Sequence, residues 1–464
     1  MRTIKIAYLV VFLMFQTTTA FSKDFSQKEW DNFYKEAISM LQNYLRIDTS
    51  NPPGNEMKAA RFFQDFFKKI GLEGQVFEVA PGRADFYLRL PGNGKKRPII
   101  LTNHMDVVQA NASNWKHPPF SGKTVAAEIW GRGALDMKTG AIADAMLIKM
   151  VKISKKKLSR DLIFLGLADE ESDGIGAEWF IKNRPELIED AEYCLNEGAT
   201  ISIKNGRVDH YGVATMEKTV LWLELRTVGK AGHGSTPQPD SALDRMISAL
   251  ERLIKTPSPI VLTSSVESYF KTIARKAPAG LREKMKNLRK FLKDEEFIKE
   301  LTKDPYNNAL LKNTVAVTSV QSGKKVNIIP GEAKALLDCR LLPGTNRDEF
   351  LAWLKKSLAD ESIEIKENLY FPTEESPVNT ELMQAIQTLA EKYDPGVPVV
   401  ALPLTGTTDS TFFRRMGITT YGFEPVRLNQ KQLLLQHGPN ERISVENLKL
   451  HLRFKFQLIN LLAK

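Results

Sequence analysis

The sequence predicts an α/β protein whose chain is interrupted by a smaller α+β unit. Short apolar runs alternate with helical patterns over the first 200 residues, which is typical of a sheet covered by helices. Between about 215 and 373 the order of strands and helices is different, and the first pattern then resumes. A chain of 464 residues is long enough for two or three domains.

The first 22 residues have the features of a secretory signal peptide. Arg2 and Lys5 precede an apolar run over 6–15, and the small residues Ala20 and Ser22 follow where cleavage requires them. The run is much shorter than the roughly 20 residues that span a bilayer. We expect export to the periplasm or the medium and no membrane span after cleavage; an uncleaved anchor or a buried first helix remains the alternative.

The composition is that of a folded globular protein. A hydrophobic content of 42% and a charged content of 26% exclude wholesale disorder and a polytopic membrane protein. The net charge is +10, but the lysine runs at 155–157 and 283–294 are typical of solvated helix faces, so we expect no nucleic-acid partner. Cys194 and Cys339 lie far apart in apolar stretches and are expected to be buried without a disulfide.

The larger unit is expected at 23–214 and 374–464, with a central mixed sheet. Its predicted helices are 30–45, 57–70, 139–153, 176–183, 379–393 and 445–462, and its predicted strands are 98–103, 161–168, 192–196, 398–402 and 418–423. Asn51-Pro-Pro-Gly separates the first two helices.

The inserted unit is expected at 215–373. Its predicted strands are 220–228, 313–320, 333–342 and 361–367, and its predicted helices are 239–255 and 346–357. This order resembles the split βαβ arrangement of ferredoxin-like domains. The lysine-rich stretch 257–312 interrupts it and is interpreted as a helical insertion that enlarges this unit.

Four polar residues follow the predicted strands of the larger unit. His104, Glu170, Glu171 and Glu197 each come at or just after a strand end. Ligands of open α/β sheets bind beyond the carboxyl ends of the strands, so these side chains are expected to converge. Asp106, two residues after His104, could orient its imidazole, and Glu170 could move a proton beside a metal.

Two imidazoles and three carboxylates together form a suitable set for two metal ions. The set is His104, Asp136, Glu171, Glu197 and His437. Mixed nitrogen and oxygen ligands favour zinc, with manganese or cobalt as alternatives. Each residue alone has a plainer interpretation: Asp136 as a helix cap, the glutamates as solvated loop residues and His437 as a surface histidine. Glu170 is the carboxylate left over.

These residues occur in motifs that resemble the co-catalytic zinc amidohydrolase family of glutamate carboxypeptidase, aminoacylase, acetylornithine deacetylase and succinyl-diaminopimelate desuccinylase. The motifs are His104-Met-Asp-Val-Val, the turn at Asp136, Ala168-Asp-Glu-Glu, Asn196-Glu-Gly, Gly232-His-Gly-Ser-Thr-Pro and the loop at His437. The large insertion and the segment Gly-Pro-Asn-Glu-Arg look most like the branch of Gly-X carboxypeptidases and N-acyl-amino-acid hydrolases.

The resemblance implies a role for each residue. His104 and Glu197 would bind one zinc and Glu171 and His437 the other, with Asp136 bridging them ahead of a cis peptide. Asp106 would orient His104, and Glu170 would transfer the proton of the attacking water. His233 would bind the oxyanion, often from a partner subunit, and Asn327 and Arg340 would hold the substrate carboxylate, on which the loop of Gly406, Thr407 and Thr408 closes. Simpler alternatives are a turn without a role for His233 and a local ion pair for Arg340.

The expected function is that of an exported di-zinc hydrolase. The amide it cleaves would join an acyl or peptidyl group to an amino acid with a free carboxylate, and the inserted unit would act as a lid and as a homodimer interface. Carboxypeptidase, dipeptidase and aminoacylase activities remain open. A rival from another class is a non-catalytic periplasmic protein that binds a peptide or an amino acid.

Overall fold

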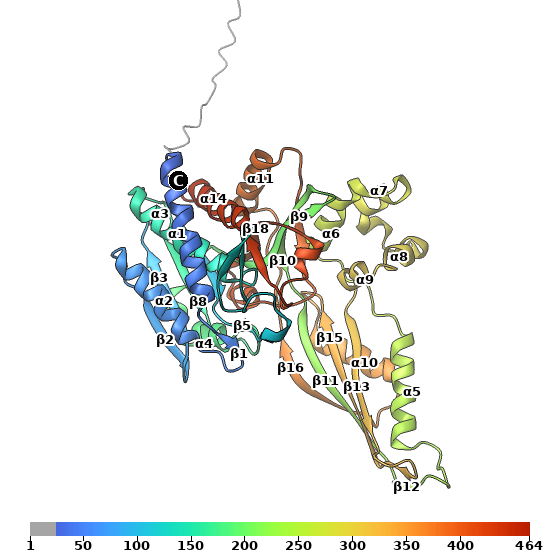
Figure 1. The fold of residues 1–464 in the computed structure, drawn as a ribbon. Coiled ribbons are helices and arrows are strands. Elements are labelled where there is room, and N and C mark those ends of the chain that lie inside the picture. The colour runs from blue at the N-terminus through green and yellow to red at the C-terminus, as the bar shows by residue number, and fades with distance from the viewer. Residues whose placement is uncertain (1–24) are drawn as a thin grey trace, which may run out of the picture.

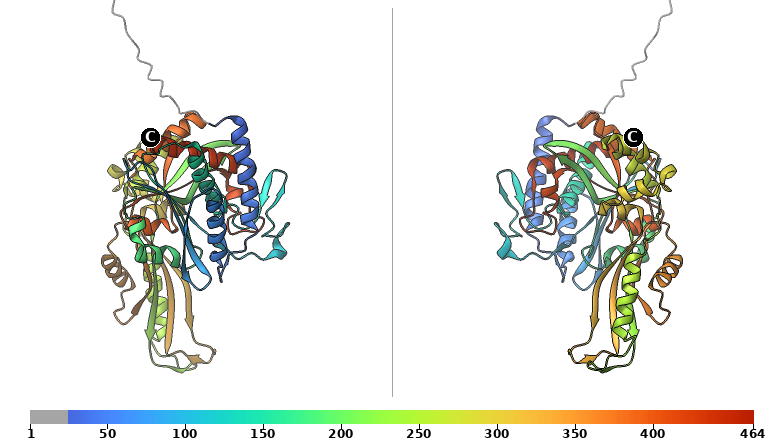
Figure 2. Two further views of the ribbon diagram at one scale, coloured as in Figure 1. Left: turned by 90° about the vertical axis from the view of Figure 1, so that its left-hand side faces the viewer. Right: turned by 90° about the vertical axis from the view of Figure 1, so that its right-hand side faces the viewer.

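The computed structural model describes residues 25–464, so the predicted signal peptide lies outside the described residues. Two units are visible: an α/β body, and a smaller unit of strands and helices that projects from it (Figure 1). The same projection is seen from both sides in Figure 2. The predicted fold class is confirmed. None of the helices within 25–464 is long and apolar enough to cross a membrane.

The body contains most of the helices and an eight-stranded sheet. Its main helices are α1 (Gln27–Leu45), α2 (Glu56–Lys69), α3 (Lys138–Ser154), α4 (Ile175–Asn183), α11 (Glu381–Tyr393), α12 (Ser410–Arg415) and α14 (Val445–Leu462). The sheet comprises β2 (Gln75–Ala80), β3 (Arg83–Leu90), β4 (Ile99–His104), β8 (Leu162–Leu167), β9 (Tyr193–Lys204), β10 (Arg207–Met216), β17 (Val399–Pro403) and β18 (Thr419–Asn429). The strand order is β17-β10-β18-β9-β4-β8-β3-β2.

The middle of this sheet is parallel and buried on both faces. Strands β18, β9, β4 and β8 pair in parallel, whereas β2, β3 and β10 bring antiparallel pairs. Ile99 and Leu101 of β4 pack toward α1, α2, α3 and α14, and Ile100 packs on the other face with residues of α4 and α12. Helices on both faces explain why every residue of β4 and β8 is buried and why β8 is an unbroken apolar run.

The projecting unit has a four-stranded antiparallel sheet. Its strands are β11 (Thr219–Val228), β13 (Thr314–Ser322), β15 (Glu332–Leu341) and β16 (Glu364–Phe371), in the order β13-β15-β11-β16. Helices α5 (Ala242–Lys255) and α10 (Arg347–Leu358) pack on one face through residues such as Met246, Phe350 and Leu354. The element order is the predicted ferredoxin-like one.

The helical insertion lies where the two sheets meet. Its helices are α6 (Ser264–Ile273), α7 (Ala279–Lys286), α8 (Glu295–Leu301) and α9 (Pro305–Leu311). They form a core of their own with Met216 and Leu342, α6 packs against β17, and the Tyr306 hydroxyl donates to the Pro403 carbonyl at 2.6 Å. The stretch 257–312 is therefore helical, as predicted, and it also covers β17, an edge strand of the body.

One strand is longer than the sequence suggested. The strand expected to end at 196 continues as β9 to Lys204 and returns as β10 through a two-residue turn at Asn205 and Gly206, both with positive φ. An Asn-Gly pair is the preferred sequence for such a turn. The pairing of β9 with β18 shifts around Glu197, beside Gly198 at φ +137°. Glu197 therefore lies at an irregularity within the strand, not at its end.

Candidate metal centre and substrate cavity

His104 stands at the carboxyl end of the buried strand β4. Its side chain is 1% exposed, and its Nδ1 lies 3.0 Å from the Asp106 carbonyl oxygen and 3.6 Å from Asp106 Oδ1. The carbonyl is thus the closer partner, and an Nδ1–H that donates to it leaves Nε2 as the ligand atom. That Nε2 lies 2.9 Å from Asp136 Oδ1 and 3.5 Å from Glu197 Oε1.

The Asp106 carboxylate holds the loop that carries the two glutamates. Asp106 Oδ1 accepts from the Glu170 amide at 3.1 Å, and Oδ2 accepts from the Glu171 amide at 3.1 Å. Oδ2 also accepts from Asn51 Nδ2 at 2.8 Å. Asp106 therefore positions the glutamate backbone at least as directly as it orients His104.

Asp136 faces both imidazoles. Its Oδ1 lies 2.9 Å from His104 Nε2 and its Oδ2 lies 3.2 Å from His437 Nε2, and the peptide bond to Met137 is cis, as expected. His437 Nε2 also lies 3.0 Å from Glu171 Oε2. A carboxylate whose two oxygens point at two different imidazoles is suited to a bridging position between two metal ions.

The turn that carries Asp136 is held by a residue the sequence reasoning missed. Buried Glu441 accepts from the amides of Gly133, Leu135 and Asp136 at 2.9, 2.6 and 3.1 Å, and pairs with Arg132 at 2.6 Å. Arg132 in turn donates to the His437 carbonyl at 3.0 Å. An acidic residue four positions after His437 was the available signal, but nothing in the sequence showed that it meets the Asp136 turn.

The carboxylates of the cluster favour positive charge on the groups around them. Contacts with Asp136 and Glu171 raise the pKa of His437 to about 10. Burial opposes charge on His104, yet Glu197, Asp106 and Asp136 raise its pKa well above the ordinary value. Burial is also the main reason that the pKa of Glu170 is well above its usual range, and Asp409 and Glu171 add to the effect. Buried carboxylates in such number require protons or metal ions as counter-charges.

The donor set fits a metal. Ligand atoms of His104, Asp136 and Glu171 lie within 4.8 Å of one another, as do those of His104, Glu170 and Glu197. Glu171 Oε1 is buried and has no hydrogen-bond partner among residues 25–464. A buried acceptor without a donor is expected where a cation binds. The second group includes Glu170, to which a proton-transfer role was assigned. Its carboxylate therefore lies close enough to the ligand atoms of His104 and Glu197 to share a metal with them.

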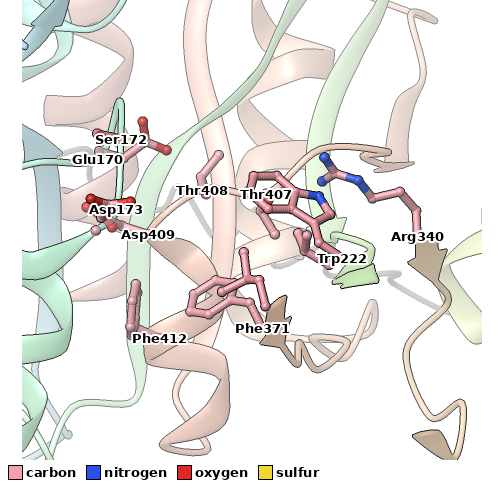
Figure 3. A pocket seen from close by; sticks show the side chains of 13 residues that line it. Glu170, Ser172, Asp173, Trp222, Arg340, Phe371, Thr407, Thr408, Asp409 and Phe412 are labelled. Carbon is pink, nitrogen blue, oxygen red and sulfur yellow. The ribbon is translucent and has the colours of Figure 1, made fainter. Parts of the chain in front are cut away.

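A cavity of about 210 Å³ begins at Glu170 and runs between the body and the projecting unit. It is lined by Glu170, Ser172, Asp173, Gly174, Val220, Trp222, Arg340, Leu369, Phe371, Thr407, Thr408, Asp409 and Phe412. In Figure 3 the carboxylates lie on the left, the Arg340 guanidinium on the right, and the rings of Phe412, Phe371 and Trp222 between and below them. Arg340 donates to Asp338 at 2.7 and 3.2 Å.

The buried carboxylate of Glu217 holds the loop before α12 in place. The Thr408 hydroxyl donates to buried Glu217 at 2.7 Å, and the Thr408 amide donates to the same carboxylate at 3.2 Å. Glu217 also pairs with Arg414 at 3.2 Å. Thr407 and Thr408 line the cavity, whereas Gly406 does not.

Two predicted site residues are remote from the cluster. His233 belongs to β12 (Gly232–His233), which pairs with β14 (Ile328–Ile329), and the Gly234 amide bonds the Asn327 carbonyl at 2.9 Å. Figure 1 shows β12 at the free end of the projecting unit, away from β8 and β9 of the body. Within one chain, therefore, His233 and Asn327 do not meet the other site residues.

Comparison with known proteins agrees with this architecture. The family model "Peptidase family M20/M25/M40" matches residues 100–460. The human N-fatty-acyl-amino acid synthase/hydrolase PM20D1 is 29% identical over 375 residues, which cover 78% of this chain and 74% of the relative. Aminoacylase-1 of Dictyostelium discoideum is 25% identical over 435 residues, with 92% and 98% coverage.

Solved structures show the same fold. The M20 family metallo-carboxypeptidase Sso-CP2 from Sulfolobus solfataricus superposes with a TM-score of 0.68 at 21% identity, covering 92% of this chain and 99% of the other. Human carnosine dipeptidase 1 superposes with a TM-score of 0.62 at 14% identity, covering 93% and 98%.

Proposed function

We propose that this chain, which belongs to peptidase family M20/M25/M40, is an exported two-zinc hydrolase that releases an amino acid bearing a free carboxylate from an acyl or peptidyl group. Membership of the family makes it a metal-dependent amidohydrolase, similar to N-acyl-amino-acid hydrolases and aminoacylases. The observation that carries the finer proposal is the convergence of His104, Asp136, Glu171, Glu197 and His437 with Glu170 beside them.

His104 and Glu197 would hold one zinc ion and Glu171 and His437 the other, with Asp136 between them. The metal pair would supply Lewis acidity toward the substrate carbonyl. Glu170, at one end of the cavity, would take the proton of the attacking water and pass it to the departing amine. Arg340, at the far side of the same cavity, would bind the free carboxylate of the substrate through its planar guanidinium.

Glu170→Gln separates this mechanism from its rivals. The amide keeps the shape of the side chain but cannot accept and return a proton, so we expect hydrolysis to fall by about two to four orders of magnitude. Two metal ions per chain, measured by elemental analysis, should remain bound. Glu128→Gln, which alters a partly exposed carboxylate paired with Arg442, is the matched control and should keep wild-type activity.

Other results of these measurements would contradict particular parts of the proposal. Hydrolysis at the wild-type rate in Glu170→Gln would reject the proton-transfer role, and loss of one metal ion would make Glu170 a ligand instead. Full activity after chelation would reject the metal proposal. Tight binding of peptides without turnover by the metal-loaded wild type would favour the non-catalytic binding protein. Export can be checked by mass, since an exported protein that retains Met1 would contradict cleavage.

A further inference from the structure

The uncovered face of the projecting sheet carries apolar residues where it approaches the body. Helices α5 and α10 pack on one face only. On the other, Val220 pairs with Phe371 and Trp222 pairs with Leu369 in adjacent rows of the β11 and β16 ladder. Trp222 is 45% exposed and Leu369 is 39% exposed, a large accessible area for such residues.

These rows continue into the substrate cavity. Val220, Trp222, Leu369 and Phe371 all line it, and Phe412 of α12 joins them from the body, with its ring centroid 4.9 Å from that of Phe371. We call these five residues the apolar wall. Further along the same face the next rows bring Glu224 opposite Lys366 and Arg226 opposite Glu364, so the apolar pairs between β11 and β16 on this face are confined to the cavity end.

The position of the apolar wall in the cavity indicates which part of a bound substrate it would contact. Glu170 lies at one end of the cavity and Arg340 at the other (Figure 3). If the scissile amide lies at Glu170 and the free carboxylate at Arg340, the α-carbon of the released amino acid lies between them. The side chain on that carbon must then enter the same space, which the apolar wall borders.

We propose that the apolar wall binds the side chain of the released amino acid, so that the enzyme selects substrates ending in a large apolar residue such as leucine or phenylalanine. This inference rests on the proposed function and adds its specificity. Burial of apolar surface favours such side chains, and each methylene in an apolar pocket changes specificity by about tenfold or more. Two aspartates also line the cavity and would favour a basic side chain. Asp173 is exposed and therefore hydrated, and Asp409 lies beside Asp173 and Glu170, apart from Trp222 and Phe371 of the wall (Figure 3).

A panel of substrates tests the inference. The zinc-loaded protein is given acetyl, dodecanoyl and glycyl derivatives of phenylalanine, leucine, alanine, aspartate and lysine, and the released amino acid is measured. For the acyl group that is cleaved best, we expect kcat/KM for phenylalanine or leucine to exceed that for alanine about tenfold or more. Equal rates, or a preference for lysine or aspartate, would overturn the inference and leave the proposed function intact. No hydrolysis of any derivative would instead contradict the proposed function.

Variants of the wall give a second readout. Leu369→Ala should lower kcat/KM for phenylalanine and leucine derivatives about tenfold and change that for alanine derivatives little. Trp222→Ala should act in the same direction, but Trp222 donates to Asp338, the partner of Arg340, so Leu369→Ala is the cleaner change. Leu336→Ala is the matched control, because Leu336 is 37% exposed on the same sheet but does not line the cavity. Equal loss on all derivatives in Leu369→Ala, or the same selectivity change in Leu336→Ala, would overturn the role of the wall.

Discussion

Glu441 shows how one residue outside the ligand set can determine the geometry of the ligands. It is fully buried, and its carboxylate accepts hydrogen bonds from three backbone amides of the turn that ends in Asp136. The same carboxylate pairs with Arg132, which donates to the His437 carbonyl. The residue thus connects the proposed bridging carboxylate to the loop of a proposed zinc ligand. Partners of this kind orient ligands and contribute strongly to metal affinity.

Glu441→Gln is expected to weaken metal binding without removing a ligand. The glutamine amide would face Arg132 and backbone N–H groups with a second donor, so at least one buried donor would lack an acceptor. Zinc affinity, measured against a competing chelator, should fall roughly ten- to hundredfold. Glu446→Gln, an exposed change in the next helix, should leave the affinity unchanged. Wild-type affinity in Glu441→Gln would show that the turn holds its shape without this carboxylate.

At the scale of elements, α14 is notable for the polar groups that it buries. Lys455 pairs with Asp144 of α3 at 2.8 and 3.0 Å, both side chains being almost fully buried. His451, one turn earlier, is fully buried, and neither ring nitrogen has a hydrogen-bond partner among residues 25–464. Burial, together with nearby Lys455, lowers the pKa of His451 well below its ordinary value. The folded protein therefore keeps this imidazole neutral where the unfolded chain protonates it.

The neutral His451 makes the stability of the folded protein depend on pH. Below the unfolded pKa of about 6.5 the unfolded chain binds one proton more than the folded one, so stability falls as the pH falls. His451→Leu removes this difference. When the pH is lowered from 7.5 to 5.5, the free energy of unfolding should therefore fall by about 1.4 kcal/mol less in the variant than in the wild type. Denaturant unfolding at both pH values measures it, with Leu448→Met as a control that removes no titratable group. Parallel pH profiles for wild type and His451→Leu would contradict the prediction.

At the scale of the whole molecule, the projecting unit places His233 and Asn327 at its free end, away from the candidate metal centre (Figure 1). We propose that a second copy of the chain, in the homodimer expected from the sequence, supplies these residues to the site. The exposed apolar residues Val326, at 105%, and Ile328, at 49%, lie beside them and would be covered in such a contact.

Mixed dimers test this arrangement. Glu170→Gln and His233→Ala should each be nearly inactive alone. In a mixed dimer, the chain with intact Glu170 would receive His233 from its partner, so one of the two sites would work. Refolding an equal mixture should restore about a quarter of wild-type activity, by random pairing in a two-fold dimer. Refolding Glu170→Gln with Asn327→Ala should also recover activity. No recovery in either mixture would place the two residues outside a shared site.

Much of the architecture was predictable because it depends on local periodicity. The alternating strands of the projecting sheet and the apolar runs of β4 and β8 appear near their predicted positions, since a side chain's direction follows from its place in the strand. Features set by pairing were missed. The β9–β10 hairpin has its Asn205-Gly206 signal, but the irregularity at Glu197 depends on β18, more than 200 residues away.

By itself, the sequence determined the family and the set of acidic and imidazole side chains that could hold a metal, because motif order and residue chemistry are properties of the chain. Only the tertiary structure decided that Glu441 supports Asp136, that the inserted helices cover β17, and that an apolar wall from two units borders the cavity. Each of these depends on contacts between segments far apart in the chain. Such contacts arise from packing whole elements against one another, which no local pattern encodes.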